Sequence, residues 1–299
     1  MVILISIIVI LHIPFTEIDK AHDDVICASL IGSGSMAFIR VNDIVTHFSA
    51  KGPARAPAIV FVNSIGADFR IWDAVAPAFS ESMYVICYDK RGHGLSDTGS
   101  GPFSIDQYVD DLLGLLSSLD VARASVVGLS IGGMIAQRLA ARAPEKIAAL
   151  LLCDTAAKIG THDMWAARIA AVGQKGMEPI ADGILERWFT KAYRETRKAE
   201  LTGWRNMLVR TPVQGYVGAC SAIRDADLSA GAAAIKAPTL CVVGDEDGAT
   251  PPDLVRAAAS TIKGARFSIV ERAGHLPCIE QPSVLVQLIK DHLQEARIV

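Results

Sequence analysis

Several features that define other classes of protein are scarce in this 299-residue sequence. Its formal net charge is −3 at pH 7 and like charges do not form long runs, so it has no basic face of the kind that binds nucleic acids by releasing counterions. Its six cysteines are scattered without C-x-x-C spacing, which gives no zinc motif and is typical of free thiols in a reducing compartment. We therefore expect a cytoplasmic protein without a nucleic-acid partner and without a bound metal.

The segment 1–35 also lacks the marks of a targeting or anchoring sequence. Its apolar run MVILISIIVILHIPF has no Lys or Arg before it, and Pro14 ends the run short of the ~20 residues that a membrane-spanning helix needs. A second methionine, Met36, follows a Gly/Ser stretch. We expect residues 1–35 to be a disordered or start-site extension, with a genuine targeting segment as the alternative, and we expect no membrane association.

From Met36 onward, strand and helix patterns alternate. The segment 36–52 predicts a hairpin with its turn at Asn42-Asp43, and the segment 104–119 has apolar residues at helical spacing with Ser104 as a candidate N-cap. Apolar runs typical of strands buried on both faces of a parallel sheet occur in PAIVFVNSIG (57–66), MYVICYDKRG (83–92), ASVVGL (124–129), IAALLLCDT (147–155), PTLCVVGDED (238–247) and, more weakly, ARFSIVERAGH (265–275). This order predicts an α/β fold with a mostly parallel, doubly wound sheet.

Strand patterns stop between about Thr155 and Ala230. Helical patterns take their place in MWAARIAAVGQ (164–174), IADGILERWFTKAYRETRKAELTGWRNML (180–208) and GYVGACSAIRDADL (215–228). We predict that residues 36–154 and 231–299 together form the α/β core, which is long enough to bury a large hydrophobic interior. Residues 155–230 are predicted to form a helical cap inserted into this core.

Gly128-Leu129-Ser130-Ile131-Gly132 lies between a predicted strand and a predicted helix and matches the G-x-S-x-G nucleophile elbow. In such an elbow the serine occupies a strained turn, and the flanking glycines are needed because a Cβ would collide with the neighbouring strand and helix. The turn lifts the Ser130 hydroxyl clear of the sheet and places the Ile131 N–H at the positive end of the helix. Ser130 is therefore the predicted nucleophile.

A serine hydroxyl needs a base and a group that orients the base. His275 follows the last predicted strand and is the preferred base, whereas His93, after an earlier strand, is the alternative. Asp247, in the Gly- and Pro-rich segment after the penultimate strand, is the preferred orienting acid. The other acidic candidates are Asp154, Asp245 and Glu246.

A developing oxyanion needs two hydrogen-bond donors. The Ile131 N–H is one of them. We expect the second from the loop FVNSIGADFRIW (61–72), where the Ile65 N–H is our choice and the N–H of Ser64 is the adjacent alternative.

The segments NSIGADFRIWD, YDKRGHGLSD, GLSIGGMIAQ, RWF, GYVGACSAIRDADL, GDEDGATPP and AGHLPCIEQP together resemble the 3-oxoadipate enol-lactonases of the β-ketoadipate pathway of aromatic catabolism, over about Met36 to Leu293. The triad segments, in the chain order Ser130, Asp247, His275, are shared by α/β hydrolases in general. The discriminating segments are Asn63-Ser64 and the cap sequences around Trp165, Arg187-Trp188 and 215–227. The resemblance implies the α/β-hydrolase fold and a serine hydrolase that opens 3-oxoadipate enol-lactone to 3-oxoadipate without a metal or organic cofactor.

The implied small-molecule substrate is a lactone that carries a carboxylate. We expect Arg187 to bind this carboxylate, with Arg168 and Arg224 as alternatives. The candidates for the remainder of the substrate pocket are Trp188, Trp165, Trp72 and Ser64. Because the fold does not fix the substrate, the alternatives are a general carboxylesterase, a carbon–carbon bond hydrolase, a cofactor-free perhydrolase and, from another class, a non-catalytic small-molecule receptor.

Overall fold

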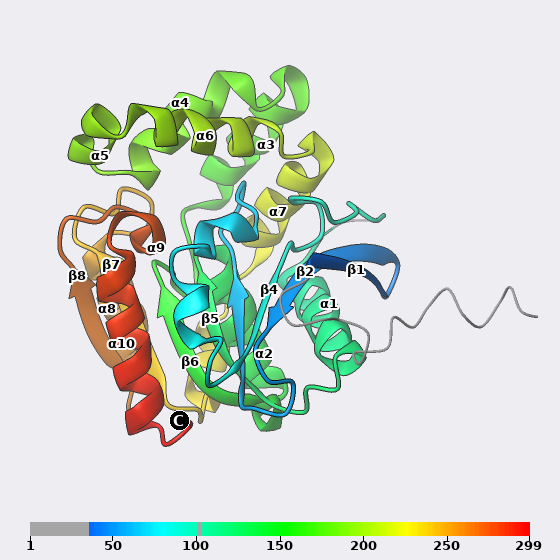
Figure 1. Cartoon of the computed structure of the whole chain (residues 1–299). Helices are drawn as coiled ribbons and strands as arrows, with labels where there is room; N and C mark the ends of the chain where they lie inside the picture. Colours follow the sequence, from blue (N-terminus) through cyan, green and yellow to red (C-terminus); the bar gives the residue numbers. More distant parts are fainter. Residues whose placement is uncertain (1–35, 101–102) are drawn as a thin grey trace, which may run out of the picture.

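The computed structural model describes residues 36–100 and 103–299, and within them the chain forms one eight-stranded sheet. The strand order is β1-β2-β4-β3-β5-β6-β7-β8 (Figure 1). β1 pairs antiparallel with β2, and β2 with β4, whereas all later neighbours are parallel. The strands are β1 (Met36–Val41), β2 (Ile44–Lys51), β3 (Ala58–Val62), β4 (Tyr84–Tyr88), β5 (Ala124–Leu129), β6 (Ile147–Cys153), β7 (Thr239–Gly244) and β8 (Arg266–Val270).

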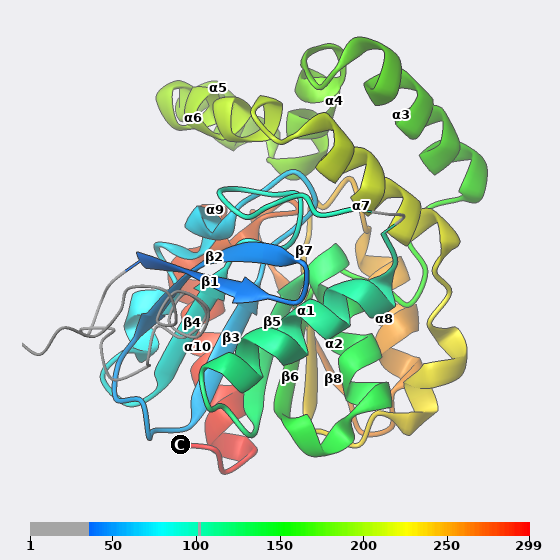
Figure 2. The same cartoon turned by 90° about the vertical axis from the view of Figure 1, so that its right-hand side faces the viewer.

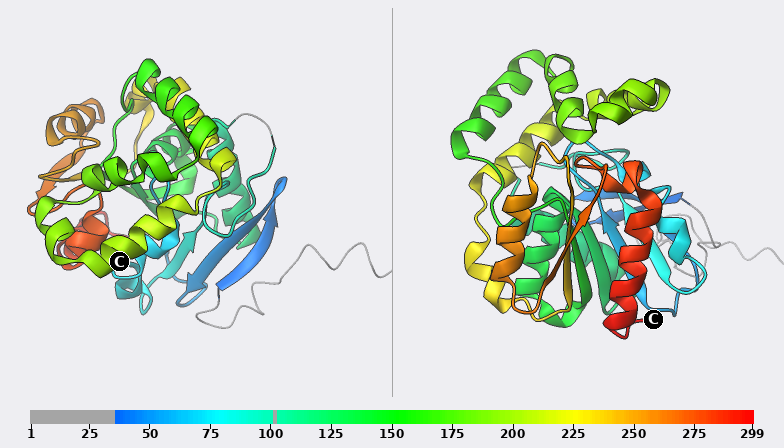
Figure 3. Two further views of the ribbon diagram at one scale, coloured as in Figure 1. Left: turned by 90° about the horizontal axis from the view of Figure 1, so that it is seen from above. Right: turned by 90° about the vertical axis from the view of Figure 1, so that its left-hand side faces the viewer.

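The central strands are buried and almost entirely apolar because helices cover both faces of the sheet. Every residue of β3, β4, β5, β6 and β7 is buried, as expected of parallel strands between two helical layers. The right-hand view of Figure 3 shows α10 on one side of the sheet and α8 on the other. The covering helices are α1 (Ile105–Ser118), α2 (Ile131–Arg142), α8 (Pro252–Thr261) and α10 (Pro282–Glu295), and the short α9 (Pro277–Glu280) precedes α10.

A group of helices follows β6 and lies above one edge of the sheet (Figures 1 and 2). These are α3 (His162–Lys175), α4 (Glu178–Trp188), α5 (Lys191–Thr196), α6 (Lys198–Val209) and α7 (Val213–Asp225). The pattern over 180–208 is divided among three of them, because both Thr190 and Arg197 leave the helical conformation. The Thr190 hydroxyl caps α5 by accepting the Tyr193 N–H. The chain returns to β7 through the short 3₁₀ segment η5 (Ser229–Ala234).

The fold class predicted from the sequence is confirmed: a mostly parallel, doubly wound sheet with helices inserted after β6. The hairpin turn lies at Asn42-Asp43, and the Ser104 hydroxyl accepts a hydrogen bond from the Gln107 N–H at 3.1 Å as the N-cap of α1. The boundaries given for core and cap stay predictions, and the expectation for residues 1–35 lies outside the described residues. Within the described part, no helix combines the length and apolar character that a membrane crossing requires.

Candidate active site

The predicted nucleophile elbow lies where β5 meets α2. Ser130 has φ 59° and ψ −119°, a left-handed conformation that strains any residue with a Cβ. A Cβ on Gly128 would overlap the backbone of Gly132, and a Cβ on Gly132 would overlap the carbonyl oxygen of Val62 on β3. The glycines therefore let strand and helix approach closely enough to hold the serine in this turn.

His275 and Asp247 come together after β8 and β7. The His275 Nδ1 lies 2.9 Å from the Asp247 Oδ2, and both side chains are buried. Since an ionised carboxylate only accepts hydrogen bonds, Nδ1 carries the proton and Nε2 is left to act as a base. The backbone N–H of His275 donates to the carbonyl oxygen of Trp188 at 2.9 Å, so the end of α4 fixes the backbone of the residue that carries the imidazole.

The Asp247 carboxylate is surrounded by donors. Its Oδ1 accepts the N–H groups of Ala249 (2.7 Å) and Thr250 (3.1 Å), and its Oδ2 accepts the Thr250 hydroxyl at 2.6 Å. Burial alone would raise the pKa of Asp247, but the charge of His275 and these hydrogen bonds outweigh it and lower the pKa below its ordinary value. Asp247 is therefore the charged acid beside His275. Thr250 had no signal in the sequence beyond its place in the turn.

Asp154, the alternative acid after β6, lies beside the pair in a different state. It is completely buried, with one oxygen accepting the Gly244 N–H at 2.9 Å and the other without a partner among the described residues. Burial, then the charge of Asp247, raises the pKa of Asp154 well above its ordinary value. The environment of Asp154 thus favours its protonated form, whereas Asp247 has the donors that a carboxylate needs.

Ser130 and His275 line one cavity of about 80 Å³. No hydrogen bond joins their side chains in this part of the described chain, and such contacts are often long until substrate is bound. Ile65 lines the same cavity. The N–H groups of Ile65 and Ile131 have no acceptor among the described residues, as the prediction of two oxyanion donors requires.

The helices inserted after β6, α3 to α7, are called the cap from here on. Two of them, α3 and α4, contribute four residues to the lining of this cavity: Trp165, Arg168, Arg187 and Trp188. The Arg168 guanidinium lies 5.0 Å from the centre of the Trp165 ring. Burial and then the charge of Arg168 lower the pKa of Arg187. Among the described residues, neither arginine pairs with a carboxylate. Two cations thus share the cavity without a counterion.

The structure separates several other candidates from this cavity. His93 is completely buried, with its Nδ1 bound to the backbone of Arg91, and Trp72 is completely buried against Phe61. Ser64 is also completely buried and does not line the cavity. Two further acidic candidates, Asp245 and Glu246, are exposed. The remaining arginine candidate, Arg224, is hydrogen-bonded to Asp225.

Asp154, Asp247 and His275 are also the described side chains whose ligand-type atoms come closest to a metal-site arrangement, within 4.8 Å of one another. Their hydrogen bonds fit a triad better. The His275 Nδ1 and the Asp247 Oδ2 are bound to each other, and both Asp247 oxygens also accept donors from the Ala249–Thr250 turn.

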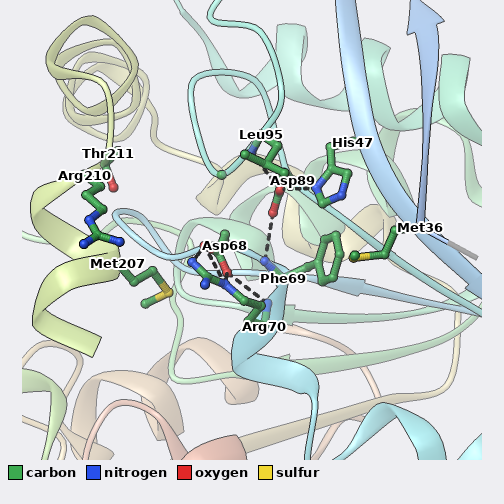
Figure 4. Close-up of a pocket in the computed structure, with 11 residues that line it drawn as sticks. Met36, His47, Asp68, Phe69, Arg70, Asp89, Leu95, Met207, Arg210 and Thr211 are labelled. Atoms are coloured by element: carbon green, nitrogen blue, oxygen red, sulfur yellow. Dashed lines mark hydrogen bonds and ion pairs between the residues drawn. The ribbon is translucent and has the colours of Figure 1, made fainter. Parts of the chain in front are cut away.

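A larger cavity of about 500 Å³ lies between the β1–β2 hairpin, the loop after β4 and the end of α6 (Figure 4). Four of its polar groups are bound in pairs, His47 to Asp89 at 2.7 Å and Arg70 to Asp68 at 2.5 Å, and Arg210 also lines it. Neither Ser130 nor His275 lines it. The smaller cavity is therefore the candidate active site, because chemistry rather than volume identifies it.

Comparisons with known proteins agree with this geometry. The model of the alpha/beta hydrolase family matches residues 59–288. The chain is 33% identical to 3-oxoadipate enol-lactonase 2 of Acinetobacter baylyi, over 82% of this chain and 91% of that protein, and 34% identical to 3-oxoadipate enol-lactonase 1 of the same organism, over 80% and 89%. The crystal structure of the enol-lactonase from Burkholderia xenovorans LB400 superposes with a TM-score of 0.84 at 38% identity, covering 86% of this chain and 100% of that one.

Proposed function

Because the chain belongs to the alpha/beta hydrolase family, we propose that it is a serine hydrolase that opens the lactone ester of 3-oxoadipate enol-lactone to give 3-oxoadipate. One observation carries the proposal: a single cavity contains the elbow serine, the imidazole held by Asp247, and two arginines that pair with no acidic side chain of residues 36–100 and 103–299. The first two groups suit an ester, and the arginines suit a substrate that carries a carboxylate. The names of the relatives support the same substrate.

In the proposed reaction the Ser130 Oγ attacks the lactone carbonyl carbon while the His275 Nε2 removes the hydroxyl proton. Asp247 stabilises the imidazolium that forms. The N–H groups of Ile65 and Ile131 donate hydrogen bonds to the oxyanion. These two peptide groups are already held in place, so they need not reorient as the charge develops.

Collapse of the tetrahedral intermediate breaks the ring C–O bond and forms the acyl-enzyme. The enolate oxygen, a better leaving group than an alkoxide, takes up the proton held by the His275 Nε2, which returns the imidazole to its neutral form. The released enol tautomerises to the ketone. A water molecule then transfers its proton to His275 and attacks the acyl-enzyme, and Ser130 leaves with a proton from His275. The product acid is 3-oxoadipate, which places the enzyme in β-ketoadipate catabolism in this proposal.

The cap supplies specificity. We assign the substrate carboxylate to Arg187, with Arg168 beside it, since the charge of a bound anion relieves the repulsion between the two guanidinium groups. Trp165 and Trp188 are the apolar walls. Trp188 also has a second role, because its carbonyl holds the His275 backbone.

The test compares three substrates: the enol-lactone, followed by its loss of ultraviolet absorbance, a neutral aryl ester, and a ring-cleavage diketone. We expect kcat/KM for the lactone to exceed the others by at least about 100-fold, and Ser130→Ala to lower kcat by about 10⁴- to 10⁶-fold. Preference for the aryl ester would indicate a carboxylesterase, and preference for the diketone a carbon–carbon bond hydrolase. A single turnover per protein molecule would indicate a receptor.

A further inference from the structure

Lys90 is a buried cation directly behind the proposed oxyanion loop. It follows β4, is 1% exposed, and its Nζ donates to the carbonyl oxygen of Ser64 at 2.6 Å. Lysine is almost never fully buried unless it is paired. Among the described residues Lys90 has no ion pair of its own, so a peptide carbonyl is its principal partner.

The surrounding ionisable groups are already bound to each other. Asp89 is bound to His47 and Asp68 to Arg70 (Figure 4). His93, in the same loop, is neutral, because burial and the charge of Lys90 hold its pKa well below the usual value. Burial lowers the pKa of Lys90 to about 7, against the smaller opposing effect of Asp89 and Asp68. The carboxylates thus compensate the ammonium only in part.

The position of this hydrogen bond is what links Lys90 to catalysis. The Ser64 carbonyl and the Ile65 N–H belong to one peptide group, so an ammonium bound to the oxygen draws electron density from the N–H at the other end. Hydrogen bonds at the two ends of a peptide strengthen one another. The Ala67 N–H also donates to the Ser64 oxygen at 3.3 Å, which further fixes the orientation of this peptide.

We propose that Lys90 is a positioning residue for the oxyanion hole, whose ammonium orients and polarises the Ser64–Ile65 peptide so that the Ile65 N–H stabilises the negative charge of the transition state. This inference rests on the proposed function, since it requires Ser130 to form an oxyanion in the cavity that Ile65 lines. Lys90 does not touch the substrate; it acts through the peptide.

The proposal has a kinetic signature. The oxyanion exists only in the transition state and the tetrahedral intermediate, so loss of the ammonium lowers kcat and leaves KM almost unchanged. Removal of a direct oxyanion donor costs about 10²- to 10³-fold. Lys90 strengthens a donor that remains present, so we expect a loss of about tenfold.

The signature also depends on pH. The ammonium is present below its pKa of about 7 and is lost above it, so the activity gained from Lys90 is full in acid and disappears in alkali. The wild-type profile therefore falls through about pH 7 to a lower level, and this alkaline limb belongs to Lys90.

The experiment measures kcat and KM for a neutral aryl ester from about pH 5.5 to about pH 9.5, roughly 1.5 units below to 2.5 units above the Lys90 pKa of about 7. It compares wild type, Lys90→Met and the exposed control Lys263→Met. Methionine keeps the length of the stem and removes the charge. We expect Lys90→Met to be about tenfold slower than wild type below neutrality, to lack the alkaline limb, and to match wild type at the highest pH. Lys263→Met should follow wild type throughout.

A ratio of wild-type to Lys90→Met rates that is the same at every pH would overturn the proposal, because a merely structural lysine gives a uniform loss. A change confined to KM would overturn it as well. Should Lys90→Met fail to fold, the wild-type enzyme still decides the matter, because a kcat profile that stays level through pH 7 to 9 contradicts a titrating Lys90. Failure of the proposed function is separate: it appears as aryl-ester hydrolysis that survives Ser130→Ala.

Discussion

Substitution of Arg187 by alanine separates substrate recognition from stability. In most proteins the loss of an ion-paired arginine weakens both, but Arg187 faces a second cation and, among the described residues, pairs with no carboxylate. Removing it relieves repulsion with Arg168 while it removes the proposed partner of the substrate carboxylate. We therefore expect Arg187→Ala to bind the lactone more weakly and to be at least as stable as wild type.

The magnitude follows from one charge-assisted contact. A hydrogen bond to a charged group contributes about 1.5–3 kcal/mol, and each 1.4 kcal/mol is a factor of ten, so full loss corresponds to roughly 10- to 100-fold. Arg187 is exposed although it lines the cavity, so solvent screening places the effect toward the lower end. The rise should be in KM for the enol-lactone, because the carboxylate is bound equally in the ground and transition states.

The assay compares KM for the enol-lactone with KM for an uncharged aryl ester, together with the midpoint of thermal unfolding. The matched control is Arg224→Ala, because Arg224 is another cap arginine but is bound to Asp225 outside the cavity. An equal change in KM for both esters would mean that Arg187 shapes the cavity rather than binds a carboxylate. A lowered unfolding midpoint would refute the repulsion between the two arginines.

Three further substitutions test the elbow and the acids. Gly132→Ala should lower the free energy of unfolding by about 2–3 kcal/mol in urea titrations and abolish ester hydrolysis, because its Cβ would overlap the Val62 carbonyl. Thr250→Val removes a donor that lowers the pKa of Asp247. It should therefore cost about 2 kcal/mol of stability at pH 7, and the difference should vanish as acid protonates Asp247 in both proteins. The raised pKa of Asp154 means that the folded protein keeps a proton that the unfolded chain releases above about pH 4. Wild type therefore loses stability as the pH rises above about 4, whereas Asp154→Asn does not. The free energy of unfolding of Asp154→Asn relative to wild type should rise by about 1.4 kcal/mol per pH unit until Asp154 ionises in the folded state. Urea titrations at several pH values would contradict this if the difference were constant.

Local patterns were enough to predict the sheet and the proposed triad positions. The strands were recognisable because parallel strands are apolar on both faces. Ser130, Asp247 and His275 each follow a strand, and the carboxyl ends of parallel strands meet at one edge of the sheet. Position along the chain thus predicted proximity in space, and the hydrogen bond between Asp247 and His275 agrees with that.

Contacts across the fold could not be predicted in this way. The Lys90 ammonium binds a carbonyl in a loop that precedes it by 26 residues, and nothing in the YDKRGHG segment indicates whether that side chain is buried. Arg168 and Arg187 share a cavity although they lie on α3 and α4. Such pairings depend on how helices pack over the sheet, and helical periodicity gives the apolar face of a helix but not its neighbour.

The cap and the proposed base are joined more closely than a division into core and lid implies. The carbonyl of Trp188 holds the His275 N–H, and Glu280 on α9 accepts hydrogen bonds from the Gly274 N–H (2.7 Å) and the Thr190 hydroxyl (2.7 Å). Trp188 at the end of α4 therefore lines the cavity beside the proposed carboxylate-binding arginine, Arg187. Its carbonyl also fixes the loop that contains His275. A movement of this segment on substrate binding would displace His275 as well. Recognition of the substrate and alignment of the base are thus mechanically coupled through one stretch of backbone.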